Sequence, residues 1–335
     1  MPSWDDLNAR ARGLSTHLLS PQALAGLAQA PDLATLGRRL AELGIDTAAD
    51  PSPAGMELAV RRVAARQARI LGRWLGERSE LLRVILEDED RRSVRALLRG
   101  AVAGAPAPAR LSGLLPTPGL PERLLEELAR AVRPRDVAGL LTVWRHPFGG
   151  PLLGPLASDQ PDLFEAEHAL DRAFAARAVA GAVRGGRALR AYVADLIDFA
   201  NVAAALALAG DAAERPAAEL YLPGGANLAP GPFTAAAQAG DTTEAVEILA
   251  AAFPEPRATL LRRHAGDPAL LERELLAGRI GMLGRQARED PLGPAPVLRY
   301  FLRLRAQLVA VRVAIWGAAL GAPPAVRSRR LPQNV

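Results

Sequence analysis

One stretch of this chain occurs twice, and a looser copy lies midway between the two. Residues 94–104 align without a gap to residues 311–321, and the matches include both glycines of the stretch. The middle copy starts at Val202, and the starting positions Val94, Val202 and Val311 are evenly spaced along the sequence. An even period of this kind predicts structural units that repeat along the chain.

A leucine–proline step follows each copy, at 115–116, 222–223 and 331–332. Proline ends a long helix because it lacks an N–H and clashes with the preceding turn. Chance similarity within a chain rich in Ala, Leu and Arg is the alternative, but the glycines, the prolines and the period favour true repeats. We therefore predict three helical repeats of roughly 108 residues each. They cover 1–115, 116–222 and 223–335 within one continuous structural unit.

A short module precedes the long helices of each repeat. Similar four-residue segments occur at 27–30, 128–131 and 236–239, and each ends a short helix in our prediction. Apolar residues recur at helical spacing, as in the series Leu7, Ala11, Leu14 and Leu18, and no segment alternates as a strand does. The predicted fold class is all-α, with three pseudo-symmetric repeats forming a funnel-like or collar-like structure.

Several helix boundaries are marked by local signals. Pro21 after Ser20 suits the start of a helix, Gly44 suits the end of one, and Asp241 and Asp267 suit the residue that caps a helix N-terminus. Residues 56–86 are predicted to form one long amphipathic helix. Residues 87–90, of sequence EDED, are predicted to be the acidic first turn of the next.

The composition removes large classes of chemistry. The chain has no cysteine and no lysine, so all 41 of its basic residues are arginine, against 36 acidic residues and a net charge of +5. Thiolate metal sites, Cys nucleophiles, Schiff-base mechanisms and a lysine-containing phosphate loop are therefore excluded. We also find no signal peptide and no charge-free apolar stretch long enough to span a membrane.

No arrangement of residues predicts catalysis. The four histidines are too far apart in sequence for the usual two-histidine metal spacing. Asp195 and Asp198 lie three residues apart on one helical face and suit acid–base chemistry, but a structural polar contact is favoured because no nucleophile lies nearby. We predict no catalytic residue, no cofactor site and no metal site.

Arginines also follow helical spacing, and two interpretations stay open. Arg62, Arg66, Arg69 and Arg73 form one basic face. Such a face suits nucleic acid, an anionic lipid surface or an acidic partner. A solvated helix face is favoured instead, because surface charge of this kind is common and single-strand binders interleave aromatic residues, of which only Trp74 is near.

The motifs together resemble the C subunit of V/A-type rotary ATPases, the counterpart of the eukaryotic V-ATPase d subunit. The resemblance rests on residues 8–14 and 18–19, on the central D-x-x-N-V formed by Asp198, Asn201 and Val202, on the P-G-G at 223–225 with Leu228, and on Tyr300, Val311 and Arg312. This chain departs from the family pattern at Gln307 and Ala310, where an acid and an asparagine are usual, and at 203–205, where alanines replace an arginine.

The resemblance implies a non-catalytic central-rotor subunit on the cytoplasmic face of a membrane. It would be peripheral, seat the central-stalk subunits of the D and F type, bear on the membrane proteolipid ring, and so link ATP hydrolysis or synthesis to transport of protons or Na⁺. No nucleic acid is expected as a partner. The expected contacts within or between repeats involve the following residues: Val94, Arg95, Asp198, Asn201, Val202, Val311 and Arg312. The alternative function is an arginine-striped helical protein that binds nucleic acid or an anionic membrane surface.

Overall fold

The computed structural model describes residues 3–74, 76–183, 185–210 and 216–331, and within these ranges it contains helices and no strand. The predicted all-α fold class is confirmed. Six helices are long, namely α4 (Pro53–Gly72), α5 (Ser79–Val102), α10 (Leu163–Ala182), α11 (Gly186–Leu208), α15 (Pro268–Glu289) and α16 (Ala295–Ala319).

The short helices fall before, between and after the long ones. They are α1 (Asp5–Ser15), α2 (Pro21–Ala28), α3 (Leu33–Glu42), α6 (Ala107–Leu111), α7 (Glu122–Arg130), α8 (Pro134–Val143), α9 (Gly149–Leu153), α12 (Pro230–Ala237), α13 (Thr242–Ala251), α14 (Arg257–His264) and α17 (Pro324–Arg329), with the 3₁₀ turns η1 (Gly76–Arg78) and η2 (Ala217–Leu220).

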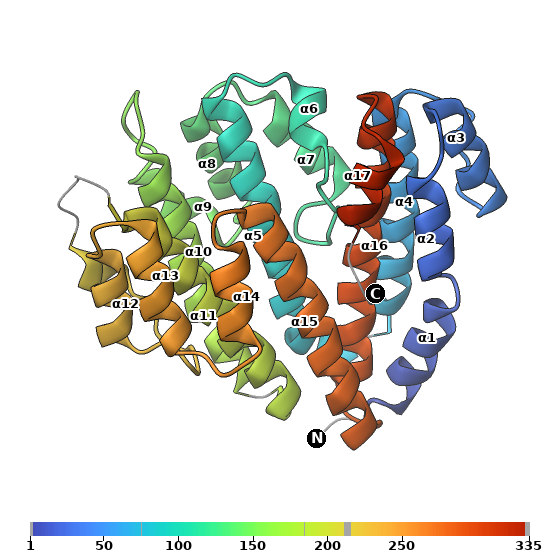
Figure 1. Cartoon of the computed structure of the whole chain (residues 1–335). Coiled ribbons are helices and arrows are strands. Elements are labelled where there is room, and N and C mark those ends of the chain that lie inside the picture. The colour runs from blue at the N-terminus through green and yellow to red at the C-terminus, as the bar shows by residue number, and fades with distance from the viewer. Residues whose placement is uncertain (1–2, 75, 184, 211–215, 332–335) are drawn as a thin grey trace.

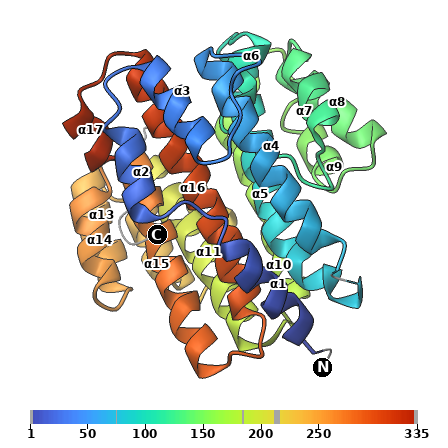
Figure 2. The ribbon, with the colours of Figure 1, turned by 90° about the vertical axis from the view of Figure 1, so that its right-hand side faces the viewer.

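The long helices form three antiparallel connections that turn at the same end of the molecule. The turns between α4 and α5, between α10 and α11 and between α15 and α16 all lie at the lower end in Figures 1 and 2. We call this the tip end. Short helices α6–α9 cover the opposite, upper end, whereas α12–α14 lie along one side (Figure 1).

The second long helix of each pair packs on the short helices that come next in the chain, and for the last pair these are the short helices at the start of the chain. Helix α5 contacts α7 and α8, α11 contacts α12 and α13, and α16 returns to α2 and α3. The last helix, α17, also packs on α2 (Figure 2). The C-terminal part of the chain therefore closes onto its N-terminal part, an order expected of three repeats. The repeat boundaries at 115 and 222 and the funnel shape stay predictions, and Pro332 of the third leucine–proline step lies outside the described residues.

Most of the predicted helix boundaries are confirmed. The Ser20 side chain accepts a hydrogen bond from the Ala23 N–H and Pro21 begins α2, while Asp241 and Asp267 cap α13 and α15 in the same way. Gly44 follows the end of α3 with φ of 79°, a conformation that glycine adopts without a steric cost.

Two predictions about the first long segment are wrong. Residues 56–86 do not form one helix, because α4 ends at Gly72 and α5 starts at Ser79. Gly76 between them has φ of 50°, which breaks the helical path. As a result, residues 87–90 lie in the middle of α5 and not in a first turn, and Asp88 is 1% exposed. The apolar periodicity runs through the turn and does not reveal it.

One described helix, α11, is long and apolar enough to cross a membrane, which differs from our expectation at the sequence level. However, 61% of its apolar window is buried inside the protein. It also carries Asp195, Asp198 and Asn201, which are buried and bound to protein groups. A helix with these features is a core helix, since its polar side chains have partners within the fold.

The core consists mainly of aliphatic side chains in three clusters, and each cluster contains one of the three repeated valines. Val94 lies in the largest cluster, Val202 in the cluster between α11 and α12–α15, and Val311 in the cluster between α16 and α2–α4. Each is at most 1% exposed. The repeated valine therefore anchors the second helix of each long pair in a local core.

Gly100 and Gly317, which are aligned in the repeat, each let an arginine side chain pass close to the helix backbone. A β-carbon at Gly100 would lie 2.7 Å from Cγ of Arg110, and one at Gly317 would lie 2.6 Å from Cγ of Arg327. The two arginines then donate hydrogen bonds to equivalent carbonyls, Arg110 to Ala131 at 2.5 Å and Arg327 to Ala30 at 2.7 Å. Both acceptors end the repeated four-residue module, so Arg327 attaches the end of the chain to its beginning.

We predict that Gly317→Ala destabilises the protein by about 1–3 kcal/mol, because the added methyl group displaces the Arg327 side chain from its path to Ala30. Gly139→Ala in α8 is the matched control: no atom lies within 4 Å of its β-carbon position, so helix propensity alone should stabilise that variant by up to about 1 kcal/mol. Urea unfolding of both variants measures the difference. Equal effects would contradict the assigned role of Gly317.

Candidate functional site: joints between the long helices and the next short module

A buried aspartate on α11 holds the loop that leads to α12. Asp198 is 0% exposed and accepts hydrogen bonds from the backbone N–H groups of Ala226 (3.2 Å), Asn227 (3.0 Å) and Leu228 (3.1 Å). A β-carbon at Gly225 would collide with its carboxylate, so only glycine lets the loop approach this closely. Three N–H donors around one carboxylate fix the course of this loop relative to α11.

Asn201, one turn further along α11, holds the same loop at its beginning. Its side chain donates to the carbonyl of Leu222 and accepts from the N–H of Leu222, both at 2.8 Å. Gly224 follows with φ of 110°. The D-x-x-N motif on α11 thus binds the loop that contains the P-G-G motif, although the two motifs are well separated in the sequence.

A second aspartate occupies the corresponding place on α5. Asp90 lies one repeat period before Asp198 in the sequence, is 4% exposed and accepts a hydrogen bond from the Thr117 hydroxyl. Nε2 of His146 lies 3.4 Å from its other oxygen. Burial raises the pKa of Asp90, an effect that these hydrogen bonds only partly offset. Asp90 therefore joins α5 to the loop before α7.

The third position, on α16, is Gln307. It lies one repeat period after Asp198 in the sequence, is 5% exposed, and its Oε1 accepts the Leu19 N–H at 2.7 Å. The family's usual acid is replaced here by a neutral amide, but the polar contact with the segment before α2 is kept. Asp90, Asp198 and Gln307, which we call the joint residues, thus each hold the segment that enters the next group of short helices.

The two repeated arginines, by contrast, make different contacts. Arg95 pairs with Asp171 at 2.5 Å and Glu167 at 3.3 Å, which joins α5 to α10. Arg312 is exposed and lies against the backbone at Gly113, and it forms no ion pair within the described ranges. The two arginines occupy equivalent sequence positions but do not make equivalent contacts. Of the two, Arg95 is the one that bridges two long helices through charge.

The sequence analysis did not predict a set of charges between the three long pairs, in which Asp88 and Arg91 are buried and Glu272 lies at the exposed edge. Arg92 donates to Asp88 at 3.1 Å and to Glu272, while Arg305 donates to Glu89 at 2.8 Å and to Glu272 at 3.3 Å. Arg91 pairs with Asp88 within α5 at 2.5 Å and with Asp171, which connects α10 to the same set. The set, which we call the central ion network, comprises Asp88, Glu89, Arg91 and Arg92 of α5, Asp171 of α10, Glu272 of α15 and Arg305 of α16.

The network holds four carboxyl groups against three guanidinium groups, and Arg95, which pairs with Asp171, brings a fourth guanidinium to it. Burial alone would raise the pKa of Asp88, but the guanidinium groups of Arg92, Arg91 and Arg305 lower it overall. Arg92, and after it Arg305, lowers the pKa of Glu272 to about 2. Charges in a low-dielectric interior are stable only when they are paired in this way. The sequence carries a signal for the neighbouring joint residue Asp90, which lies one repeat period before Asp198, but none for the network itself.

The two aspartates that the sequence places on one face of α11 have different partners. Asp195 is engaged by Arg279 at 2.5 Å and by Arg257, whereas Asp198 faces backbone N–H groups, so the two carboxylates act separately and both serve structure. Among the described side chains, no group of three or more His, Asp or Glu residues has the geometry to hold a metal ion.

Comparison with known proteins identifies the family of the chain. The sequence model of the ATP synthase (C/AC39) subunit family matches residues 7–329. No individual curated protein matches the chain. Because the match spans nearly all of the sequence, the chain belongs to the C/AC39 family of V/A-type ATP synthase subunits. The resemblance inferred from the motifs is thereby confirmed, and the protein is a subunit of a rotary, membrane-associated ATPase complex.

We predict that Asp198→Ala destabilises the protein more than Gln307→Ala. The first change leaves three backbone N–H groups without their acceptor and should cost at least about 3 kcal/mol, whereas the second leaves one such group and should cost about 1–3 kcal/mol. Denaturant unfolding followed by circular dichroism measures both. A larger loss for Gln307→Ala would show that the joints are not held as described.

The central ion network predicts a specific loss of stability in acid. Since the pKa of Asp88 is lowered in the folded state, the stability it provides is present above its ordinary pKa of 3.8 and is lost as the pH falls below that value. Asp88→Asn should cost about 3–5 kcal/mol at neutral pH and flatten the dependence of unfolding free energy on pH between about 4 and 2. The exposed Glu219→Gln is the control and should leave both unchanged.

Proposed function

We propose that this protein is the non-catalytic central-rotor subunit that couples the stalk to the proteolipid ring in a V/A-type ATPase. Its partners would be the central-stalk subunits of the D and F type on one side and the ring on the other. It would act on the cytoplasmic face of the membrane, so that ATP hydrolysis or synthesis is linked to transport of protons or Na⁺.

The observation that carries this proposal is the cyclic order of contacts. Each joint residue holds the segment that enters the next short module, and Gln307 and Arg327 return the chain to its first module. A part that passes torque between two partners has to resist twisting. Contacts that run around the whole molecule and include directional hydrogen bonds supply that resistance.

The central ion network supports the same role. It connects α5, α10, α15 and α16, and so joins all three pairs of long helices through charge as well as through apolar contact. We infer that the three predicted repeats act as one rigid body, and that the surfaces for the stalk and the ring lie outside these internal contacts.

Binding to nucleic acid is less well supported. The basic face of α4 has Arg62 paired with Glu122 at 3.3 Å, and Trp74 is the one aromatic residue beside it. A protein that stacks bases would need more aromatic rings interleaved with its arginines.

We predict that tagged protein, purified from mildly solubilised native membranes, brings with it the proteolipid and the large ATPase subunits. Mass spectrometry identifies the recovered chains, and an untagged strain is the control. Membranes lacking the protein should still hydrolyse ATP but should lose ATP-driven ion transport, because the coupling part is missing. Failure to recover both ring and ATPase subunits at low and moderate salt would reject the rotor assignment.

A further inference from the structure

Each of the three turns at the tip end presents an exposed apolar side chain. Trp74 is 51% exposed, Val183 68% and Leu292 63%. Positions 74, 183 and 292 are evenly spaced along the sequence, with the same period as the joint residues. Large apolar residues exposed at equivalent positions of one end mark a surface that meets something less polar than water.

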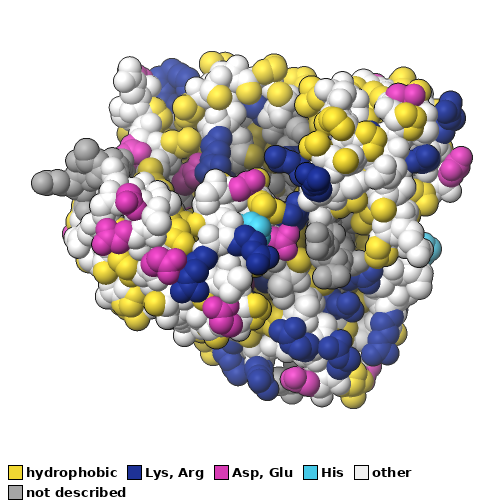
Figure 3. All heavy atoms as spheres, viewed as in Figure 1, with side chains coloured by type: hydrophobic (Ala, Val, Ile, Leu, Met, Phe, Trp, Pro, Cys, Tyr) yellow, Lys and Arg dark blue, Asp and Glu magenta, His cyan; other side chains and the backbone are white. Residues whose placement is uncertain are grey.

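Arginines without an acidic partner surround these turns. In the described part of the chain, none of the following forms an ion pair: Arg12, Arg66, Arg69, Arg73, Arg187, Arg190, Arg285, Arg288, Arg299 and Arg303. They lie on α1, at the end of α4, at the start of α11 and on both sides of the turn between α15 and α16. Figure 3 shows the lower end of the molecule covered mainly by basic side chains.

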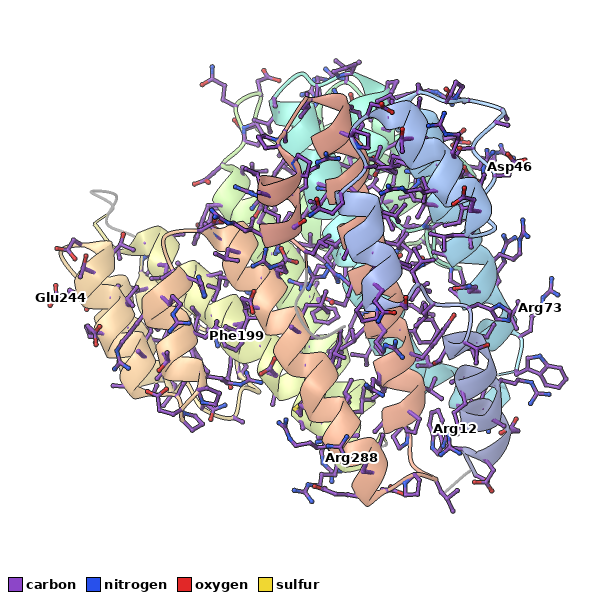
Figure 4. All side chains as sticks on the ribbon, turned by 45° about the vertical axis from the view of Figure 1, so that its right-hand side comes forward. Arg12, Asp46, Arg73, Phe199, Glu244 and Arg288 are labelled. Carbon is purple, nitrogen blue, oxygen red and sulfur yellow. The ribbon has the colours of Figure 1, made fainter. Side chains whose placement is uncertain are left out.

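Figure 4 labels some of these residues. Arg12 and Arg288 lie near the lower end, Asp46 lies near the upper end, and Arg73 projects from the α4 side at about the height of Glu244. Arginines elsewhere are more often neutralised, as in the central ion network. Ten arginines that form no ion pair in the described residues therefore lie at the end that also carries the exposed apolar residues.

A cavity of about 130 Å³ at this end is lined in part by arginines. Arg12 of α1 and Arg299 and Arg303 of α16 line it together with Tyr300. The Nε atoms of Arg299 and Arg303 are buried and have no hydrogen-bond partner. Burial, and then the charge of Arg299, lowers the pKa of Arg303. Like charges that line one cavity without a carboxylate create a site that an anion would stabilise.

We propose that the tip end docks on an anionic phospholipid surface. Arg12, Arg299 and Arg303 hold a headgroup phosphate in their cavity, the surrounding arginines pair with neighbouring headgroups, and Trp74, Val183 and Leu292 enter the interfacial layer. Arginine attracts anionic headgroups, and tryptophan is enriched at the boundary between headgroups and acyl chains. Arg10 lies 3.6 Å over the Trp74 ring and places a cation beside that residue.

A lipid surface fits these observations better than a free anion or a nucleic acid. A free anion would occupy the cavity but would give no reason for three exposed apolar turns. A nucleic acid would account for the arginines but not for Val183 and Leu292, which offer no ring for stacking. The proposal goes beyond the rotor assignment, since it concerns lipid and not the ring subunits.

The test is co-sedimentation of the purified full-length protein with vesicles at low salt. Vesicles of equal parts phosphatidylcholine and phosphatidylglycerol should bind it, and vesicles of phosphatidylcholine alone should not. Arg299→Gln with Arg303→Gln should weaken binding by about 30-fold, since two charges near an anionic surface are removed. Trp74→Ala should weaken it further and abolish the blue shift of tryptophan fluorescence that accompanies binding.

The matched control removes the same charge elsewhere. Arg145→Gln with Arg263→Gln changes two exposed arginines that lack ion pairs in the described residues and lie outside the tip end. This variant should bind within about twofold of the unchanged protein, apart from the general effect of net charge. Circular dichroism establishes that all variants are folded.

Three outcomes would overturn the proposal: no binding to anionic vesicles, equal loss of binding in the control variant, or binding of inorganic phosphate or an oligonucleotide without binding of vesicles. None of these outcomes depends on recovery of ring and ATPase subunits from native membranes. Failure of lipid binding and failure of the rotor assignment are therefore distinguishable.

Discussion

Pairing of buried charge is the constraint on which the packing of the long helices depends. Four arginines and as many acidic groups lie between α5, α10, α15 and α16, counting Arg95 with the central ion network, and Asp88 and Arg91 at its centre are buried. An unpaired ion in such a place would cost several kcal/mol. The helices therefore can approach one another only in the alignment that brings each guanidinium to its carboxylate. Apolar packing then fills the remaining space without having to specify that alignment.

The joint residues solve a different problem, the attachment of loops. A loop that crosses a helix buries backbone N–H groups, and each needs an acceptor. Asp198 satisfies three such groups, while Gln307 satisfies one with a neutral oxygen. This explains why Gln307 can replace an acid: the position calls for an acceptor, and charge is needed only where several donors converge.

The sequence predicted much of the fold and less of the site. Helix starts at Pro21, Asp241 and Asp267 follow from local capping chemistry, so they could be read directly. The turn at Gly76 could not, because the apolar period continues through it, and that error misplaced residues 87–90. The central ion network was missed for a related reason. Charge pairs between helices that are far apart in the sequence, such as Arg91 with Asp171 and Arg305 with Glu89, leave no local pattern.

The mixture of contacts inside the protein also bears on how it deforms. Apolar side chains attract without regard to direction, so two helices joined only by leucine and alanine can slide past each other at little cost. Hydrogen-bonded ion pairs are sensitive to angle and distance, and a small sideways shift breaks them. Arg92 and Arg305 both bind Glu272, so these contacts resist sideways movement of the helices that carry them. They oppose shear between α5 and the pair formed by α15 and α16.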